Sequence, residues 1–277
     1  MRFSIQIKGN LKFLDTPWLM GILNVTPDSF FEASRQKNLD ELLKNAEKML
    51  SEGADILDIG GYSTRPGASE VSLQEELKRV IPAIEAVRKN FPDSLISVDT
   101  FRAEVAQKAV EAGADIINDV SGGNLDEAMF ETVARLQVPY ILMHSRGNPQ
   151  TMTQMCHYEN FLIEILHFFV QKIKKLRILG VKDIIADVGF GFAKNIDQNF
   201  FLLKNLSYFQ ILQVPLLVGI SRKSMIYKTL SISPQEALNG TTALNMFALT
   251  QGANILRIHD VKEAKEAVIL YQKLRDS

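Results

Sequence analysis

A short pattern that recurs four times constrains the fold of this chain more than any other feature. Each copy has a glycine, then an apolar run, then polar residues, and the copies begin at Gly53, Gly113, Gly180 and Gly252. Glycine readily adopts the left-handed conformation in which many helices end. A short apolar run after such a signal is typical of a strand that is buried on both faces. Repeated helix–strand units of this kind predict a parallel sheet.

The rest of the 277 residues can be assigned to the same alternation. We expect eight strands, near residues 18–24, 56–59, 95–99, 114–118, 140–144, 183–187, 215–219 and 253–257. Amphipathic helices separate the strands, with clear apolar faces at 39–50 and 73–87. This alternation predicts an α/β fold, the (β/α)8 TIM barrel, because doubly wound parallel sheets usually contain fewer strands.

The N-terminal residues have a different pattern from the rest of the chain. Residues 3–15 alternate loosely in polarity around Gly9-Asn10, a pair that favours a tight turn. We therefore expect an N-terminal β-hairpin extension, residues 1–17, that covers the bottom of a barrel formed by residues 18–277. No linker or low-complexity stretch interrupts residues 1–277, which predicts a single domain.

The composition argues against several classes of protein. The chain has 31 basic and 32 acidic residues, a balance that does not suit a general polyanion-binding surface. Its one cysteine, Cys156, excludes a disulfide framework within the chain and fits a reducing compartment. The N-terminus does not read as a signal peptide, and no uncharged apolar stretch approaches membrane-spanning length. We expect a cytoplasmic protein that binds neither nucleic acid nor membranes.

Polar or otherwise functional side chains follow every expected strand. In barrels of this kind the active site lies where the strands meet the loops that follow them. The residues at these positions include Asn24, Thr64, Arg65, Asp99, Asn118, Met143, His144, Asp187, Ser221, Lys223, Arg257 and His259. A single Asp at a strand end is weak evidence, since it often caps the next helix. Functional residues at all eight strand ends together predict an active site.

The segments that carry these residues resemble the signature motifs of the dihydropteroate synthase family of pterin-binding barrels. The longest are Met20-Gly-Ile-Leu-Asn-Val-Thr-Pro-Asp-Ser-Phe30 and Gly60-Gly-Tyr-Ser-Thr-Arg-Pro-Gly67, and the resemblance covers about residues 18–275. It implies a homodimeric transferase of folate biosynthesis that condenses 6-hydroxymethyl-7,8-dihydropterin pyrophosphate with 4-aminobenzoate, giving 7,8-dihydropteroate and pyrophosphate. It also implies competitive inhibition by sulfonamides, which mimic aminobenzoate.

For the pterin ring, the resemblance implies contacts from Asp99, Asn118, Met143, Asp187, Lys223 and Arg257. These residue types suit the chemistry of the ring. A buried carboxylate accepts two neighbouring N–H groups of the pterin edge, and Asp187 is the candidate. Asn118 can donate and accept along the same edge, and the planar guanidinium of Arg257 can stack on the ring face.

For the pyrophosphate, the resemblance implies Asn24, Thr64, Arg65, Arg257 and His259, with a Mg²⁺ cofactor held by phosphate oxygens and Asn24. Magnesium keeps several waters and takes few protein ligands, so one amide oxygen is reasonable. The C–O bond breaks to leave a pterin methylene cation. Stabilisation of the departing pyrophosphate is therefore expected to contribute most to catalysis. The implied catalytic set is Asp99, Lys223, Arg65, Arg257 and His259.

For aminobenzoate, the resemblance implies contacts from Phe30, Thr64, Pro66, Phe190, Ser221 and Lys223. We expect the aromatic ring to lie between Phe190 and the aliphatic stem of Lys223. Its carboxylate would be received by Ser221 or by a helix N-terminus.

Two alternatives remain open beside an active synthase. The first loop reads Phe31-Glu-Ala-Ser34 where many family members have Ser-Asp-Gly-Gly, and this difference motivates the alternative of a pterin-binding paralogue without catalytic activity. The intact residues Lys223, Phe190, Arg65 and Asn24 argue against it. A pterin-dependent methyltransferase domain would share the barrel but would leave the pyrophosphate set unexplained. Tyr62, Ser145 and Val188 also differ from the usual family residues, and His144 is interpreted as structural.

Overall fold

The computed structural model describes residues 3–25, 35–62, 71–147 and 151–277 of the chain. Within these residues, eight parallel strands form a closed barrel, in which the last strand pairs with the first. In chain order the barrel strands are β3 (Trp18–Asn24), β4 (Ile56–Gly60), β5 (Leu95–Asp99), β6 (Ile116–Asp119), β7 (Tyr140–Met143), β8 (Ile184–Asp187), β9 (Leu216–Val218) and β10 (Ile255–Ile258). The predicted (β/α)8 barrel is confirmed.

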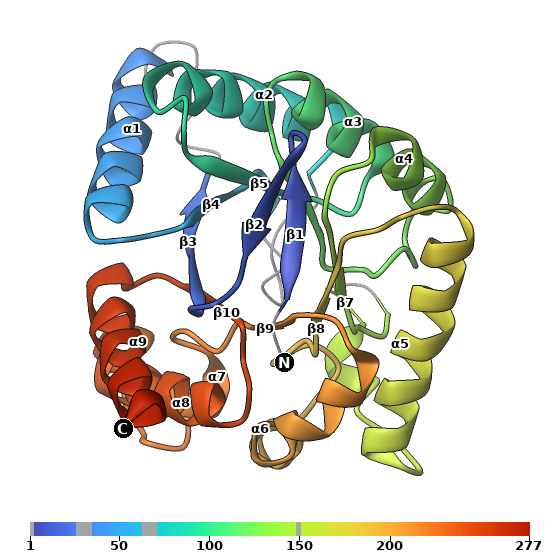
Figure 1. Ribbon diagram of the computed structural model, residues 1–277, viewed down its shortest axis with the longest axis vertical. Coiled ribbons are helices and arrows are strands. Elements are labelled where there is room, and N and C mark those ends of the chain that lie inside the picture. Colours follow the sequence, from blue (N-terminus) through green and yellow to red (C-terminus); the bar gives the residue numbers. More distant parts are fainter. Residues whose placement is uncertain (1–2, 26–34, 63–70, 148–150) are drawn as a thin grey trace.

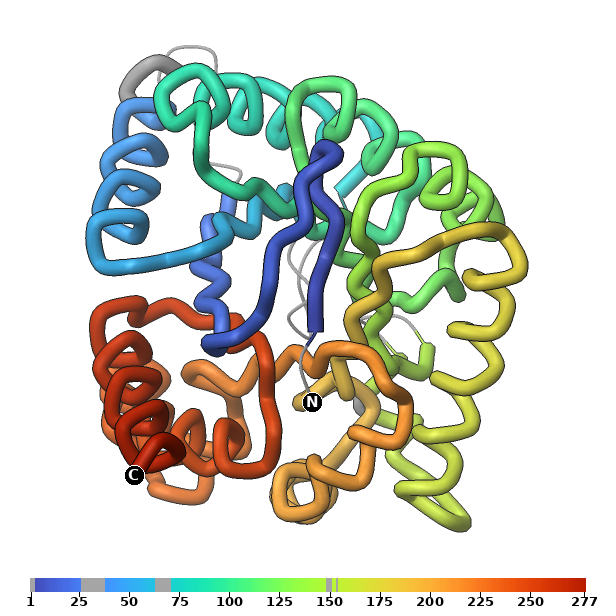
Figure 2. Tube along the Cα trace, in the orientation of Figure 1, coloured from blue at the N-terminus to red at the C-terminus, as the bar shows by residue number. Residues whose placement is uncertain are grey.

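The helices form a ring outside the strands and follow chain order around it (Figure 1). They are α1 (Arg35–Ser51), α2 (Leu73–Asn90), α3 (Ala103–Glu111), α4 (Met129–Leu136), α5 (Phe161–Ile178), α6 (Ile196–Lys204), α7 (Ser224–Tyr227), α8 (Leu238–Thr250) and α9 (Val261–Asp276). Figure 2 traces this single circuit, which closes where α9 contacts β3. In the described ranges, no helix combines the length and apolarity that crossing a bilayer requires.

The recurring glycines end helices in the way that the sequence predicts. Gly53, Gly113, Gly180 and Gly252 all have positive φ, between 89° and 116°. The backbone N–H of Gly53 donates to Leu50 at 3.1 Å, and the next N–H donates five residues back to Met49 at 2.9 Å. This is the hydrogen-bond pattern of a helix end closed by a left-handed glycine. The chain can therefore leave each of these helices and enter the next strand without strain.

Two helical stretches are each divided into two elements. After β8, α6 is followed by the 3₁₀ helix η3 (Leu206–Leu212). Before β10, the short 3₁₀ helix η4 (Pro234–Glu236) is followed by α8. At η4, Ser233 and Glu236 form a reciprocal capping box, so the first turn is stabilised by its own cap rather than by continuation into α8.

The N-terminal hairpin covers one end of the barrel, as predicted (Figure 1). Its strands, β1 (Ser4–Ile7) and β2 (Asn10–Phe13), pair antiparallel. Ile5 and Ile7 are buried. Burial of each side chain stabilises the folded protein by roughly 1.5–3 kcal/mol. They pack on an apolar layer inside the barrel, formed by Met20, Ile56, Ile116, Ile141, Ile185, Leu217 and Ile255.

A second layer of inward-facing residues lies above this apolar layer, toward the carboxyl ends of the strands. Side chains alternate along a strand, so the residue two positions after each apolar residue faces the same interior. These residues are Ile22, Asp58, Asn118, Met143, Asp187, Gly219 and Arg257. The barrel thus changes from apolar to polar within one residue pair along each of several strands, and the polar layer is where the candidate site begins.

Candidate active site

The centre of the site is an arginine held between two carboxylates. Arg257, on β10, donates from Nε to Oδ2 of Asp58 and from Nη2 to Oδ2 of Asp99, both at 2.6 Å. Asn118 donates from Nδ2 to the same oxygen of Asp58 at 3.1 Å. β10 is separated from β4 by β3 in the barrel. Closure of the barrel, rather than nearness in sequence, brings these side chains together.

Burial governs the charge of this cluster. Burial raises the pKa of Asp99 to about 7, and the pull of Arg257 in the opposite direction does not cancel it. Burial also lowers the pKa of Arg257, but Asp58 and Asp99 more than offset that effect, so the net shift is upward. Arg257 therefore keeps its positive charge, and Asp99 is a carboxyl that a change in its partners can readily protonate.

The cluster contains polar atoms whose hydrogen bonds are incomplete. Oδ1 of Asp58 and Oγ of Ser97 are buried, and neither has a hydrogen-bond partner among the described residues. Leaving a buried acceptor unpaired costs about 1–3 kcal/mol. A ligand that brings N–H donors into the barrel mouth would remove this cost, so the arrangement suits recognition of a polar heterocycle.

Asp58 is a site residue that our sequence reasoning missed. It stands inside an apolar strand and is 1% exposed, which makes it resemble a residue of the core. A signal was nevertheless present in the sequence. Asp58 follows Ile56 by two positions, the same offset that separates Asn118 from Ile116 and Arg257 from Ile255.

The end of β8 adds a second pair of opposite charges. Asp187 is 6% exposed and accepts the backbone N–H of Gly189 at 2.8 Å. Burial raises the pKa of Asp187, while Lys223 opposes the shift. Burial lowers the pKa of Lys223 to about 8, and Asp187 opposes that shift in turn. Lys223 also donates to the backbone carbonyl of Phe190. The site therefore offers an acceptor and a donor on the same side of the barrel mouth.

The structure places the side chain of the predicted residue Phe190 in the main core, where it is 0% exposed. This position favours a structural role for the ring. The Nζ atom of Lys223 lies instead 4.9 Å from the ring centroid of Phe192. Gly189 and Gly191 both have positive φ on either side of Phe190, and Phe192 is partly exposed where Phe190 is buried.

The structure shows where several of the remaining predicted residues lie. Met143 is 2% exposed, in the inner layer. Oγ of Ser221 lies 2.9 Å from Nδ1 of His259 and also accepts the His259 backbone N–H at 3.2 Å, so it orients the imidazole. The role of Ser221 toward aminobenzoate stays a prediction. Asn24 is exposed at the end of β3. The predicted residues Phe30, Thr64, Arg65 and Pro66 lie outside the described residues.

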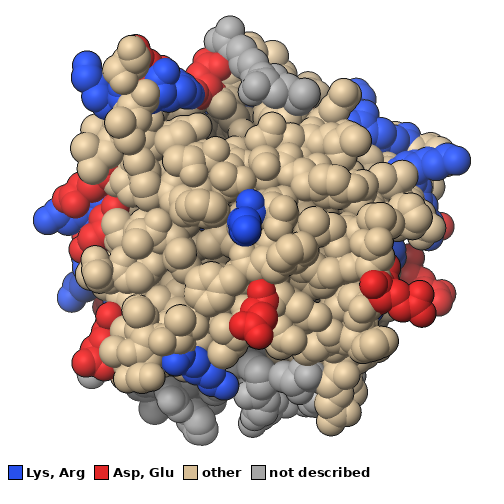
Figure 3. Space-filling view, turned by 90° about the horizontal axis from the view of Figure 1, so that it is seen from below, with Lys and Arg blue, Asp and Glu red and all other residues tan. Residues whose placement is uncertain are grey.

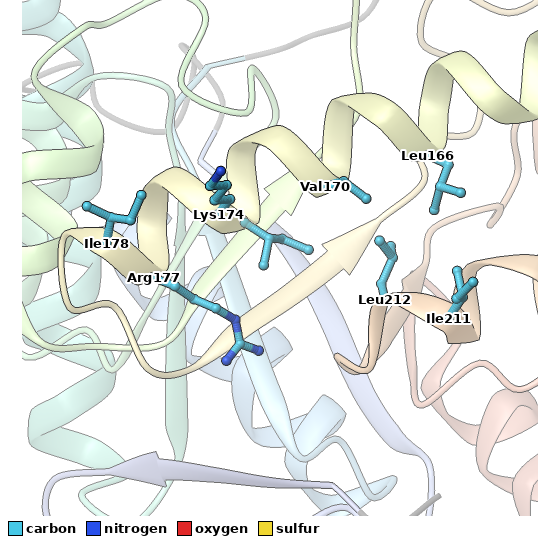
Figure 4. Close-up of a pocket in the computed structure, with 8 residues that line it drawn as sticks. Leu166, Val170, Lys174, Arg177, Ile178, Ile211 and Leu212 are labelled. Carbon is cyan, nitrogen blue, oxygen red and sulfur yellow. The ribbon is translucent and has the colours of Figure 1, made fainter.

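A groove on the outside of the barrel is not part of this site. It lies between α5 and η3, has a volume of about 550 Å³ and is drawn in Figure 4. Its lining is mostly apolar, from Leu166, Val170, Ile173, Lys174, Arg177, Ile178, Ile211 and Leu212. None of the predicted site residues lines it, and it offers no side-chain carboxylate.

Comparison of the sequence with known proteins identifies a family. The family model described as "Pterin binding enzyme" matches residues 20–259. The dihydropteroate synthase of Escherichia coli strain K12 is 44% identical over 257 residues, which cover 92% of this chain and 90% of the relative. The dihydropteroate synthase of Haemophilus influenzae is 43% identical over 272 residues, which cover 97% and 98%.

Solved structures agree with the sequence comparison. Yersinia pestis dihydropteroate synthase, in a complex with a sulfonamide drug, has a TM-score of 0.92 at 42% identity and covers 99% of this chain and 100% of its own. Xanthomonas albilineans dihydropteroate synthase with 4-aminobenzoic acid has a TM-score of 0.90 at 37% identity and covers 99% and 98%. Similarity over almost the whole chain, in sequence and in fold, shows that this chain belongs to the dihydropteroate synthase family of pterin-binding enzymes.

Proposed function

We propose that this chain is an active pterinylmethyl transferase that condenses 6-hydroxymethyl-7,8-dihydropterin pyrophosphate with 4-aminobenzoate, giving 7,8-dihydropteroate and pyrophosphate. The observation that carries the proposal is the buried cluster of Asp58, Asp99, Asn118 and Arg257, with its unpaired carboxylate oxygen, beside Asp187 and Lys223. Relatives named dihydropteroate synthase, one of them solved with 4-aminobenzoic acid, support the same reaction.

The pterin ring enters the inner polar layer in this proposal. Asp187 and the unpaired oxygen of Asp58 accept N–H groups of the ring, while Asn118 donates or accepts beside them. Lys223 donates to the ring carbonyl. Two carboxylates fix the plane of the Arg257 guanidinium before any ligand arrives, so little conformational entropy is lost when it stacks on the ring. A ring without these donors would leave buried groups unpaired, which gives selectivity.

The chemical step exchanges one bond for another at the pterin methylene carbon. The C–O bond breaks and its electron pair leaves on the pyrophosphate oxygen. The C–N bond forms from the lone pair of the aminobenzoate nitrogen, which then loses a proton. Asp99, held by Arg257 at 2.6 Å, stabilises the positive charge that develops on the methylene carbon. Arg257 and His259, with Thr64 and Arg65, stabilise the departing pyrophosphate.

Aminobenzoate binds in this proposal beside the ring of Phe192 and the stem of Lys223. The 4.9 Å separation of the Lys223 ammonium from the Phe192 centroid supports this assignment. The ring of Phe190, by contrast, is fully buried in the main core. The predicted contacts of Phe30, Thr64 and Pro66 would complete the pocket. A sulfonamide drug is named with the Yersinia pestis relative, and we expect sulfonamides to compete with aminobenzoate for this chain as well.

Magnesium is part of the proposal, with Asn24 as its protein ligand. Asn24 is exposed at the carboxyl end of β3, and its side-chain oxygen is the kind of donor that magnesium prefers. When bound, the ion neutralises charge on the pyrophosphate. We expect Asn24→Ala to raise the Mg²⁺ concentration needed for half-maximal activity, measured by a magnesium titration. An unchanged requirement would remove Asn24 from the metal site.

A homodimer in the cytoplasm completes the proposal. Figure 3 views the molecule from below Figure 1, where α6 and α8 lie, and most of the centre of this face is uncharged. Large apolar side chains are exposed on α6, on η3 and on α8, including Phe201, Ile211 and Phe247. Such surface favours burial against a second copy. Light scattering would report twice the chain mass for the native protein and a single chain mass for Phe247→Asp.

The proposed reaction is tested by pyrophosphate release. Purified protein would receive the pterin pyrophosphate and Mg²⁺, with and without 4-aminobenzoate. We expect release that depends on aminobenzoate and is matched by formation of dihydropteroate. Tight pterin binding without turnover would instead indicate a paralogue that binds pterin without catalysing the reaction.

A further inference from the structure

Lys194 is a buried lysine outside the predicted site. Its side chain contacts the loop after β8 and His144, at the end of β7. Lys194 follows β8 by seven residues and is 6% exposed. Its Nζ atom lies 3.0 Å from the Gly189 carbonyl oxygen, 2.9 Å from the Phe192 carbonyl oxygen and 3.0 Å from Nδ1 of His144. Burial lowers the pKa of Lys194 to about 7. In its protonated form the group has three N–H donors, and these contacts use them all. No carboxylate is among the three acceptors.

His144 is the fixed support for this lysine. It is 2% exposed at the end of β7, and burial, reinforced by Lys194, lowers its pKa well below the usual range. A neutral imidazole can accept at Nδ1 and carries its proton on Nε2. The loop also touches His144 through its backbone, because a Cβ on Gly189 would overlap the carbonyl oxygen of His144. Lys194 thus ties the loop after β8 to the end of β7.

The same loop carries two groups that face the proposed aminobenzoate site. With the carbonyls of Gly189 and Phe192 turned to Lys194, the intervening carbonyl of Phe190 is turned to Lys223 and accepts from it. The ring of Phe192 lies against the same Lys223 ammonium. Two lysines therefore hold the loop from opposite sides, one in the interior and one at the site.

We propose that Lys194 is a positioning residue that sets the Phe192 ring and the Lys223 ammonium for aminobenzoate. It touches neither substrate and acts through the loop of residues 188–194. Its effect on the pterin acceptor Asp187 is smaller, because pairing of β8 on both sides in the barrel fixes the backbone of Asp187. This inference rests on the proposed synthase activity, since it assigns Lys194 a part in that reaction.

The first test measures the KM for each substrate and kcat in Lys194→Met. This substitution keeps an aliphatic side chain and removes the N–H donors. We expect the KM for aminobenzoate to rise about tenfold, with kcat and the KM for the pterin substrate changed less than about twofold. Lys204→Met, an exposed lysine on α6, is the matched control and should change none of these values. Equal changes in both KM values for Lys194→Met would overturn the proposal.

A double-mutant cycle with Phe192→Leu tests whether Lys194 acts through that ring. We expect the fold-increase in the KM for aminobenzoate in the double variant to be well below the product of the fold-increases in the two single variants. Independent, multiplicative effects would contradict action through Phe192. If Lys194→Met does not fold, His144→Leu removes one of the three acceptors instead. This variant should also raise the KM for aminobenzoate more than the KM for the pterin substrate, by a smaller factor than Lys194→Met. Equal changes in the two KM values would count against the proposal.

Hydrogen exchange separates this inference from the proposed function. The Phe192 amide donates to Gly189 at 3.1 Å and the Gly191 amide to Asn199 at 2.7 Å, so both report on the loop. We expect both amides to exchange faster in Lys194→Met than in the native protein. If the native protein is inactive, the proposed function fails, and this measurement still decides whether Lys194 holds the loop. Unchanged exchange would overturn the role of Lys194.

Discussion

The two ends of the barrel each bury a carboxylate beside an arginine, but only one of the two carboxylates has a charged partner at its second oxygen. At the hairpin end, Oδ2 of Asp115 accepts from Arg88 at 2.6 Å and from the Ile96 amide at 2.8 Å. Its Oδ1 accepts no hydrogen bond among the described residues but forms an ion pair with the Lys8 ammonium at 2.6 Å. At the opposite end, Oδ2 of Asp58 has two donors, and its Oδ1 has none among the described residues.

This difference teaches how to separate a structural ion pair from a functional one. A buried carboxylate whose oxygens are all paired has reached its lowest free energy without a ligand. A buried carboxylate oxygen without a partner raises the free energy of the folded protein, and a ligand that donates a hydrogen bond to it removes this cost. An aspartate–arginine pair stands at both ends, and the difference lies at the second carboxylate oxygen, which Lys8 pairs in Asp115 and which has no partner among the described residues in Asp58.

The largest contrast is expected on removing the arginine from each end. Arg257→Met would leave two buried carboxylates without their cation and should lower kcat/KM by on the order of a thousandfold, equivalent to about 3–5 kcal/mol. Arg88→Met should leave kcat/KM nearly unchanged and lower the free energy of unfolding by about 1–3 kcal/mol. Steady-state kinetics and urea denaturation measure the two effects. Loss of activity in Arg88→Met would break the comparison.

The two aspartates should separate function from stability more sharply. Asp58→Asn should lower kcat/KM by about 10- to 100-fold, while the free energy of unfolding stays the same or rises, because a buried charge with an open oxygen is removed. Asp115→Asn should lower the free energy of unfolding by about 1–3 kcal/mol and leave kinetics intact. If Asp58→Asn were the more destabilised variant, its open oxygen would not be a functional feature.

The two phenylalanines after β8 provide a smaller contrast within the site. Phe192→Leu should raise the KM for aminobenzoate by about three- to tenfold, from the loss of an aromatic contact. Phe190→Leu should lower the free energy of unfolding by about 1–3 kcal/mol and shift both KM values little, since its ring is buried in the core. The reverse pattern would restore the original assignment of Phe190.

The smallest effect concerns pH. Burial lowers the pKa of Lys223 from 10.5 to about 8, so its ammonium is present below pH 8 and is lost as the pH rises through that value. The kcat/KM for the pterin substrate should fall over the same range, and Lys223→Met should show a flat profile there. Between about pH 8 and 10.5 the unfolded chain binds more protons at this lysine, so its contribution makes stability rise with pH. A pH-independent kcat/KM above pH 8 in the native enzyme would remove the ammonium from pterin binding.

Much of the fold was predictable because its signals are local. A glycine at a helix end and an apolar run after it report on a few neighbouring residues, and the structure confirms the barrel and the hairpin built from them. Less was predictable where several elements meet. Asp58 was missed because a carboxylate in an apolar strand shows its partners, Arg257 and Asn118, only after the barrel closes. The choice between Phe190 and Phe192 depended on the path of one loop.

The sequence by itself determined the alternation of helix and strand, the end of each strand at which polar residues gather, and the family to which these residues belong. These follow from local backbone preference and from the two-residue period of a strand. Only the tertiary structure decided which polar groups are satisfied and which remain open. Hydrogen bonds such as those of Arg257 with Asp58 and Asp99 join residues up to 199 positions apart. Their geometry is set by closure of the whole barrel, which no local pattern encodes.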